Sequence, residues 1–135
     1  EYIGSVNGVD FFNDSKATNI DSAIKACNSM NGETALIVGG YDKGIAYDGF
    51  FTNLPDTIKH IIATGDNVYS IMQFLPSYHE YTFEITSSLE RAVELAVQKS
   101  VKNVLFSPTT SSFDRYSSYV ERGEHFDMIV ANMKD

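Results

Sequence analysis

The sequence predicts an α/β fold of Rossmann-like type, in which helices on both faces of a mostly parallel sheet make three layers. Short apolar runs alternate along the chain with helical stretches of about 10–15 residues, which is the pattern of βαβ units. Near the start, Asn7-Gly8 separates two strand-like runs, and this pair favours a type I′ turn. We therefore expect an N-terminal hairpin to supply one antiparallel strand.

Six short strands are expected. They cover residues 2–6, 9–13, 34–38, 60–64, 81–85 and 103–106. Gly39-Gly40 ends the third strand, Gly65 ends the fourth, and a polar loop is expected from Gly40 to Asp48. The run at residues 81–85 is the weakest, which indicates a place near an edge of the sheet.

Apolar residues at helical spacing predict four helices along the chain. Their apolar positions are Ile20, Ala23, Ile24 and Cys27; Val68, Ile71, Met72 and Leu75; Leu89, Ala92, Val93, Ala96 and Val97; and Phe126, Ile129, Val130 and Met133. Asn19 opens the first helix, and Asp66 or Asn67 would cap the second. Ser87 and Glu90 form a capping box for the third helix.

Length and composition limit the classes of protein to be considered. The 135 residues fit a single domain, and a net charge of −8 argues against nucleic acid or an anionic membrane as partner. One cysteine, Cys27, is incompatible with an internal disulfide or a cysteine-cluster zinc site, so a reducing cytoplasm is expected. No apolar run approaches the ~18 residues of a membrane span, and no secretory signal opens the chain. Because the chain starts at Glu1 rather than Met, we expect a piece of a longer protein.

Ligands of parallel sheets bind beyond the carboxyl ends of the strands. Four segments follow predicted strands at that end. They are residues 14–19, 39–47, 65–67 and 107–114. We call residues 14–19 the first loop and residues 39–47 the second loop. The third loop is the longer stretch of residues 107–118 that begins with residues 107–114.

The first loop combines charged and hydroxyl side chains just before a helix. Lys16, Thr18 and free backbone N–H groups could converge on an anion, although a solvated loop with an Asn or Thr cap explains the same composition. The sequence contains no G-x-x-x-x-G-K-[ST] motif, so this chain by itself cannot cradle a nucleoside triphosphate in the usual way.

The second and third loops are weaker signals when each is taken alone. Residues 39–44 contain three glycines and Lys43, but not the dinucleotide fingerprint, so a nicotinamide site is rejected and a plain glycine-rich loop stays open. Five hydroxyl residues lie within positions 107–112, and Arg115 and Arg122 follow them. That composition suits recognition of a carboxylate or phosphate, and it also suits a flexible loop.

The remaining chemically reactive residues give no further site. His60, His79 and His125 lack metal-ligand spacing, so no metal site is predicted. We interpret His60 as flanking a strand, His79 and His125 as surface residues, and Cys27 as part of the core.

Taken together, four motifs resemble one family. They are Asn13-Asp14-Ser15-Lys16-Ala17-Thr18-Asn19, Gly39-Gly40-x-Asp42-Lys43-Gly44, Ser107-Pro108-x-x-x-Ser112-Phe113-Asp114 and Glu121-Arg122-Gly123-x-x-Phe126. In this order and spacing the chain resembles, over essentially its whole length, the C-terminal domain of the Mur ligases. The turn around Lys16 is the specific element, and it is similar to that of the branch that adds D-glutamate.

The resemblance implies that residues 1–135 are the third domain of a three-domain bacterial enzyme of peptidoglycan synthesis, without its UDP-substrate-binding and ATPase domains. Such an enzyme is an ATP-dependent, amide-forming ligase. ATP phosphorylates the carboxylate of UDP-N-acetylmuramoyl-L-alanine, and the amine of D-glutamate attacks the acyl phosphate. The central domain would bind Mg²⁺ and most of ATP. The resemblance further implies a cytoplasmic monomer, and this chain alone is expected to be inactive.

The resemblance also assigns roles to individual residues. Those assigned to the two carboxylates of D-glutamate are Thr18, Lys43, Ser112 and Tyr119, the last through its backbone N–H. Asp14 would contact the ATP ribose, and Lys16 would face the phosphates and the reacting carboxylate as the catalytic residue. The family usually has Phe in place of Tyr119, and a backbone contact survives that difference.

Two alternatives remain open. A folylpolyglutamate-type ligase would add glutamate to another acceptor, and Lys16 within the first-loop motif argues against it. A receiver-like, non-enzymatic α/β module would need a cluster of acids, which could be formed by Asp14, Asp42 and Asp66. Receivers, however, place paired acids after the first strand, and this pattern is not met.

Overall fold

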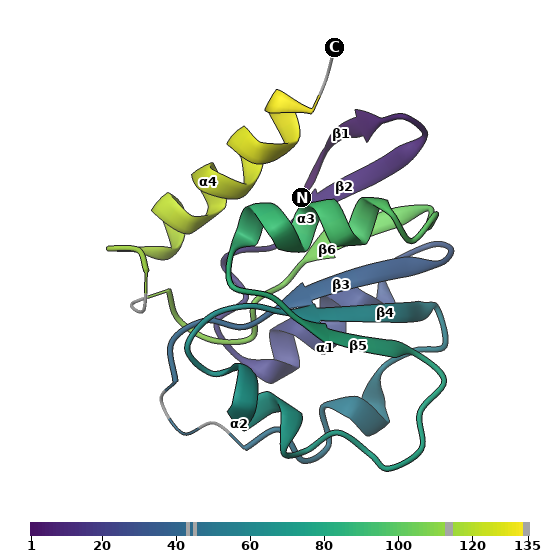
Figure 1. The fold of residues 1–135 in the computed structure, drawn as a ribbon, viewed down its shortest axis with the longest axis vertical. Helices are drawn as coiled ribbons and strands as arrows, with labels where there is room; N and C mark the ends of the chain where they lie inside the picture. The colour runs from purple at the N-terminus through teal and green to yellow at the C-terminus, as the bar shows by residue number, and fades with distance from the viewer. Residues whose placement is uncertain (43, 45, 113–114, 134–135) are drawn as a thin grey trace.

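In the part of the chain that the computed structural model describes, residues 1–42, 44, 46–112 and 115–133, one six-stranded sheet organises the molecule (Figure 1). The strands lie in the order β1-β2-β6-β3-β4-β5. Their bounds are β1 (Tyr2–Val6), β2 (Val9–Asn13), β3 (Thr34–Val38), β4 (Ile58–Ala63), β5 (Thr82–Ile85) and β6 (Asn103–Phe106). All neighbours pair in parallel except β1 and β2, which confirms the predicted fold class.

The N-terminal hairpin forms as expected. Asn7 has a φ of 52° and Gly8 a φ of 82°, the two left-handed conformations that a type I′ turn requires. The hairpin places β1 at one edge, while β2 pairs in parallel with β6. The weakly predicted strand β5 forms the other edge, as expected.

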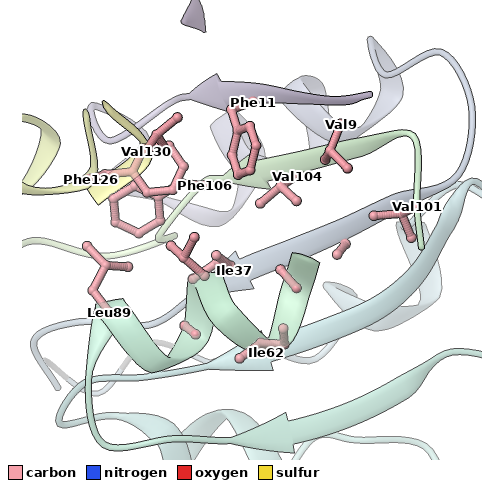
Figure 2. Close-up of a cluster of buried hydrophobic side chains, with 14 of the residues drawn as sticks. Val9, Phe11, Ile37, Ile62, Leu89, Val101, Val104, Phe106, Phe126 and Val130 are labelled. Atoms are coloured by element: carbon pink, nitrogen blue, oxygen red, sulfur yellow. The ribbon is translucent and has the colours of Figure 1, made fainter. Parts of the chain in front are cut away.

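Helices cover both faces of the sheet. Their bounds are α1 (Ile20–Asn28), α2 (Val68–Met72), α3 (Leu89–Val97) and α4 (Tyr119–Asn132), together with the 3₁₀ helix η1 (Phe51–Asn53). One core lies under α3 and α4, where Phe106 of β6 and Phe126 of α4 stack with ring centroids 4.9 Å apart (Figure 2). The other core lies under α1, α2 and η1, and it includes Cys27, which confirms the core assignment of that thiol.

Several element boundaries differ from those predicted. Strand β4 begins at Ile58, two residues early, so His60 lies inside the strand rather than at its flank, and β5 begins one residue late at Thr82. Helix α2 ends at Met72, so Leu75 lies beyond it. Helix α4 ends at Asn132, with Met133 as its C-cap.

The predicted cap of α3 is wrong by one residue. Helix α3 begins at Leu89, so its N-cap is Ser88, whose Oγ accepts a hydrogen bond from the Arg91 N–H at 3.1 Å. Ser87 lies too early for this geometry, because an N-cap side chain reaches the N–H two or three residues ahead within the first turn. Asn19 caps α1 as predicted, by accepting from the Ser22 N–H at 2.8 Å.

The expected polar loop after β3 is only partly polar. Tyr47 and Phe50 are almost wholly buried and meet edge to face, with ring centroids 5.6 Å apart. Phe50 also packs against Phe51 of η1, with centroids 5.1 Å apart. The segment therefore supplies an aromatic part of the second core, and this anchors the far end of the second loop.

Candidate functional site

The first, second and third loops leave the sheet at one edge. The parallel register pairs Asn13 of β2 with Phe106 of β6, and Phe106 in turn with Ile37 of β3. Because β6 lies between β2 and β3, the third loop must run between the other two. The carboxyl ends of these strands form the rim at which Thr18, Lys43 and Ser112 were predicted to converge.

Direct hydrogen bonds join the third loop to the first. The Ser107 hydroxyl donates to the Asp14 carboxylate at 2.9 Å, and the Thr109 N–H donates to the Ala17 carbonyl at 3.1 Å. The Asp14 N–H in turn donates to the Phe106 carbonyl at 2.8 Å, which continues the ladder past the end of the strand. The first loop is thus held in a defined shape by its neighbour.

A second set of bonds joins the third loop to the second. The Gly39 N–H donates to the Pro108 carbonyl at 2.8 Å, and the Tyr41 N–H donates to the Ser111 carbonyl at 2.9 Å. The Thr110 hydroxyl returns a bond to the Tyr41 carbonyl at 2.9 Å. The third loop therefore connects the other two loops into one surface.

Glycine is required where the second loop begins. Gly39 has a φ of 113°, and a Cβ built there would lie 2.0 Å from the Thr64 carbonyl oxygen. A side chain would therefore meet both backbone strain and a backbone clash. This close approach brings the second loop against the end of β4.

A buried polar network fixes the second loop from below. The Asn67 side chain accepts from the Gly40 N–H at 2.9 Å and donates to the Tyr47 Oη, also at 2.9 Å. The Tyr47 Oη lies 2.6 Å from the Thr109 Oγ1, and that hydroxyl donates to the Pro108 carbonyl. Burial, with a smaller contribution from the negative charge of Asp42, raises the pKa of Tyr47, while its two hydrogen bonds oppose the shift. The network ties three strand ends together through neutral groups.

Helix α4 docks on the first loop through a buried arginine. Arg122 is 2% exposed, and its Nη2 donates to the Ser15 carbonyl at 2.9 Å. The Asn13 side chain donates to the Gly123 carbonyl at 3.0 Å and to the Asp127 carboxylate at 2.7 Å. These contacts set the start of α4, and with it Tyr119, beside the first loop.

Lys16 is exposed at the junction of two grooves. One groove, of about 760 Å³, is lined by Asp14, Lys16 and Lys25 among other residues. The second, of about 260 Å³, is lined by Lys16 and Tyr119 among others. The structure thus brings the predicted nucleotide-binding pair into one groove and joins that groove, through Lys16, to the start of α4.

The other predicted site residues occupy different environments. Thr18 is half-buried, while Ser112 is 2% exposed and follows Ser111, the residue bonded to the second loop. Tyr119 is the first residue of α4 and is 49% exposed. Lys43 lies outside the described residues, so its place relative to the others stays a prediction.

The thiol of Cys27 lies near the end of α1, in the second core. Burial, followed by the negative charge of Asp14, raises the pKa of Cys27 to about 12. The thiol therefore stays protonated and unreactive near neutral pH. Within the described ranges, no three His, Cys, Asp or Glu side chains gather in a way that could hold a metal ion. No helix in this part of the chain is both long and apolar enough to cross a membrane.

Sequence reasoning missed several residues that shape this rim. Tyr47 carries no motif, because its importance comes from a partner far away in the chain. Asn67 was considered only as a helix cap; it is the N-cap residue of α2, but its side chain bonds to Gly40 and Tyr47 rather than to the helix. Arg122 was noted as a nearby cation and as part of a family motif, but its burial was not predicted, and it is 2% exposed. His125 was predicted to be a surface residue, yet its ring is half-buried between Tyr116 and Glu90.

Comparison with known proteins gives a consistent match. Residues 1–108 match the family model described as Mur ligase, glutamate ligase domain. Three similar proteins are each named UDP-N-acetylmuramoylalanine–D-glutamate ligase: those of Alkaliphilus oremlandii (35% identical over 99% of this chain), Lachnospira eligens (35% over 98%) and Koribacter versatilis (39% over 100%). The chain spans about 30% of the length of each.

Proposed function

Since the chain belongs to the Mur ligase family, and matches its glutamate ligase domain, we propose that it is the domain that binds D-glutamate in an ATP-dependent ligase. The substrate that receives D-glutamate would be UDP-N-acetylmuramoyl-L-alanine. The remaining length of the relatives leaves room for the two further domains that the reaction needs. We place the reaction in the cytoplasm, where ATP and UDP-linked precursors are found.

The observation that carries the proposal is the joining of three loops at one rim. Each loop holds at least one residue assigned to D-glutamate or to the phosphorylated UDP-N-acetylmuramoyl-L-alanine. Direct hydrogen bonds join the third loop to each of the other two. A dicarboxylate needs donors at both of its ends, and a rim of this kind can supply them from separate loops. Because the chain has a net charge of −8, attraction for a dianion must be local, and Lys16 and Lys43 provide it.

The proposed roles follow from the chemistry of each group. Lys43, the Thr18 hydroxyl, Ser112 and the Tyr119 N–H would together hold the two carboxylates of D-glutamate. Fixing both carboxylates leaves the amino group as the free end of the substrate. Positioning of this kind lowers the barrier by supplying the entropy of alignment in advance.

The nucleotide would lie toward the groove that Asp14 and Lys16 share. A carboxylate accepts hydrogen bonds from ribose hydroxyls, and Asp14 uses one oxygen for Ser107, which leaves further acceptor capacity. The exposed ammonium group of Lys16 suits the phosphates and the carboxylate under attack, so we propose Lys16 as the catalytic residue. ATP would supply the phosphoryl group that activates this carboxylate, and we place Mg²⁺ in the central domain.

The family match counts against one of the two alternatives. A receiver-like module does not belong to this family, so that hypothesis is set aside. A folylpolyglutamate-type ligase remains the nearer competitor. The names of the similar proteins favour D-glutamate addition instead.

A titration followed by NMR chemical shifts tests the proposal on the chain of residues 1–135. D-Glutamate should perturb amides in all three loops, whereas D-alanine, which lacks the second carboxylate, should perturb fewer and more weakly. Affinity should be about millimolar or weaker (~−4 kcal/mol), because the domain that closes over the site is absent. Lys43→Ala should abolish the response.

Lys102→Ala is the matched control. Lys102 precedes β6 at the opposite end of the strand, where its carbonyl accepts from the Asp10 N–H at 2.9 Å. This variant should respond to D-glutamate like the wild type. Equal responses to D-glutamate and D-alanine, or an unchanged response in Lys43→Ala, would show that the dicarboxylate site is misplaced.

A further inference from the structure

A chain of side-chain hydrogen bonds crosses from the third loop to α4 and on to α3. The Tyr116 Oη lies 2.5 Å from the His125 Nδ1, and the His125 Nε2 lies 3.1 Å from the Glu90 carboxylate. The Tyr116 and His125 rings also pack together, with centroids 5.6 Å apart. Three elements that are separate in sequence thus meet through one imidazole ring.

This chain of bonds ends at the backbone of Ser112. The Ser112 carbonyl accepts from the N–H groups of Tyr116 at 3.0 Å and of Arg115 at 3.2 Å. The Arg115 side chain is anchored in turn, because its Nη1 donates to the Thr64 Oγ1 at 3.1 Å. The side chains of Arg115 and Tyr116 therefore anchor the two residues whose N–H groups bind the Ser112 carbonyl.

Within the described ranges, the charged groups that face His125 come from α3, the third loop and α4 itself. Glu90 faces it from α3, and Arg115 on the third loop acts on Glu90 as a further positive charge. On α4 itself, Glu121 and Arg122 lie one turn earlier, and they are bonded to Ser117 and Ser15 respectively. The pKa of Glu90 is lowered chiefly by its own backbone N–H, and then by the hydrogen bond and charge of His125 and by Arg115, while burial opposes the shift.

Protonation of His125 reverses one bond of the chain. In the neutral ring, Nδ1 accepts from the Tyr116 hydroxyl while Nε2–H donates to Glu90. In the protonated ring both nitrogens donate, so the Tyr116 oxygen must become the acceptor. The Tyr116 hydroxyl proton then has to point away from His125. This reorientation takes place on Tyr116, the residue whose backbone N–H donates to the Ser112 carbonyl.

We propose that Tyr116, His125 and Glu90 are positioning residues that set the place of Ser112 and couple it to the protonation state of His125. The coupling itself stands on the contacts described above. Its consequence for substrate, a D-glutamate affinity that varies with pH, rests on the proposed function.

Backbone and ring shifts measured between about pH 5 and 8 on residues 1–135 test the coupling without any ligand. In the wild type, the Ser112 amide should titrate with the same midpoint as the His125 ring. Tyr116→Phe keeps the ring packing and removes the hydroxyl, so His125 should still titrate while Ser112 no longer follows. Glu90→Gln should move the His125 midpoint, and the Ser112 midpoint should move with it.

The Arg91–Glu94 pair on the same helix provides the control. These side chains are 3.7 Å apart and mostly exposed, and Glu94→Gln should change neither midpoint. A Ser112 amide that does not follow His125 in the wild type, or that still follows it in Tyr116→Phe, would overturn the proposal.

The substrate arm uses D-glutamate titrations at the two ends of the pH range. Wild-type affinity should differ by about threefold to tenfold, the range that one neutral hydrogen bond supplies, and the affinity of Tyr116→Phe should stay constant. A pH-dependent affinity that persists in Tyr116→Phe would overturn the role of this network in binding. Absence of D-glutamate binding to the wild type at any pH would count against the proposed function, while the shift measurements would still decide the coupling.

Discussion

The two ends of the sheet bury polar side chains in very different numbers. Among the described residues, those at or beyond the carboxyl ends of the strands are Thr64, Asn67, Ser107, Thr109, Thr110, Ser112 and Arg122, whereas those at the amino ends are Thr34 and Asn103. At the amino end the pair is satisfied locally, since the Asn103 side chain donates to the Asn31 carbonyl at 3.0 Å and to the Thr34 hydroxyl at 3.3 Å. At the carboxyl end the partners are both backbone groups and side chains, and they come mainly from the loops that leave the strands.

The difference shows where this fold uses polar burial. Burying a polar group without a partner costs free energy, so each such group needs a bond of fixed geometry. At the amino end those bonds join the start of β6 to the start of β3 and the segment before it. At the carboxyl end they hold three loops in register with one another, which is the arrangement that a site assembled from several loops needs.

The largest effect should come from the buried arginine at the carboxyl end. Arg122→Ala removes the bond to the Ser15 carbonyl and leaves a cavity, so we expect the free energy of unfolding to fall by about 2–4 kcal/mol. Arg122→Met refills much of the volume and should recover part of the loss. Urea unfolding of both variants measures the change.

Arg91→Ala is the control for the two Arg122 variants, because Arg91 is an exposed arginine that pairs with Glu94 at the surface. It should change the free energy of unfolding by no more than about 0.5 kcal/mol. If Arg122→Met proved as stable as the wild type, the buried guanidinium would contribute nothing to holding the first loop. The contrast between the two ends would then rest on the neutral groups alone.

Two tyrosines give a sharper test, because one substitution can be made at each end. Tyr47 has two hydrogen-bonded partners at the carboxyl end, while Tyr81, which precedes β5 at the amino end, has a buried hydroxyl that finds no partner in the described structure. Tyr47→Phe should cost about 1–2 kcal/mol, because Asn67 and Thr109 each lose a partner. Tyr81→Phe should be neutral or stabilising.

Thermal unfolding of the two variants side by side decides the comparison. Burial alone raises the pKa of Tyr81 to about 12, so this phenol gains nothing by ionising and Phe is a fair replacement. Equal losses in the two variants would mean that the network at Tyr47 contributes no more than aromatic packing does.

The regular elements of this fold could be predicted because their signals are local. The Asn7-Gly8 pair by itself predicts a turn, and a continuous apolar run such as that of β3 predicts a strand buried on both faces. The rim of the sheet followed from parallel topology, which places loops that leave neighbouring strands side by side. The roles of Asp14, Lys16, Thr18, Ser112 and Tyr119 came from the family resemblance and stay predictions.

What could not be predicted depends on partners distant in sequence. Tyr47 lies in a short glycine-bounded stretch, residues 44–49, with neither helical nor strand periodicity, so no pattern marked it as core. Its hydroxyl partner Thr109 is 62 residues away. His125 meets Glu90 across 35 residues, and the sequence pattern assigned Glu90 only to a capping box and His125 only to the surface. The cap of α3 failed for a different reason: two adjacent serines offer two registers, and only the start of the helix at Leu89 selects Ser88.

The smallest effect should appear at the amino half of the sheet, where His60 of β4 bonds to the Thr82 hydroxyl at 2.7 Å. Burial, followed by the charge of Lys99, lowers the pKa of His60 from its ordinary value of 6.5, while Glu84 and Glu33 oppose the shift. The folded state therefore favours the neutral ring, so the contribution is present above pH 6.5 and is lost as the pH falls through the lowered pKa. His60→Asn keeps a polar group near Thr82 and should flatten this part of the stability–pH curve, by no more than about 0.5 kcal/mol.

Urea unfolding at a series of pH values checks the slope of that curve. NMR chemical shifts recorded over the same series should show that the pH response of the Ser112 amide is the same in His60→Asn as in the wild type. A Ser112 amide that responds to His60→Asn as it does to Tyr116→Phe would show that the two ends of the sheet are not independent.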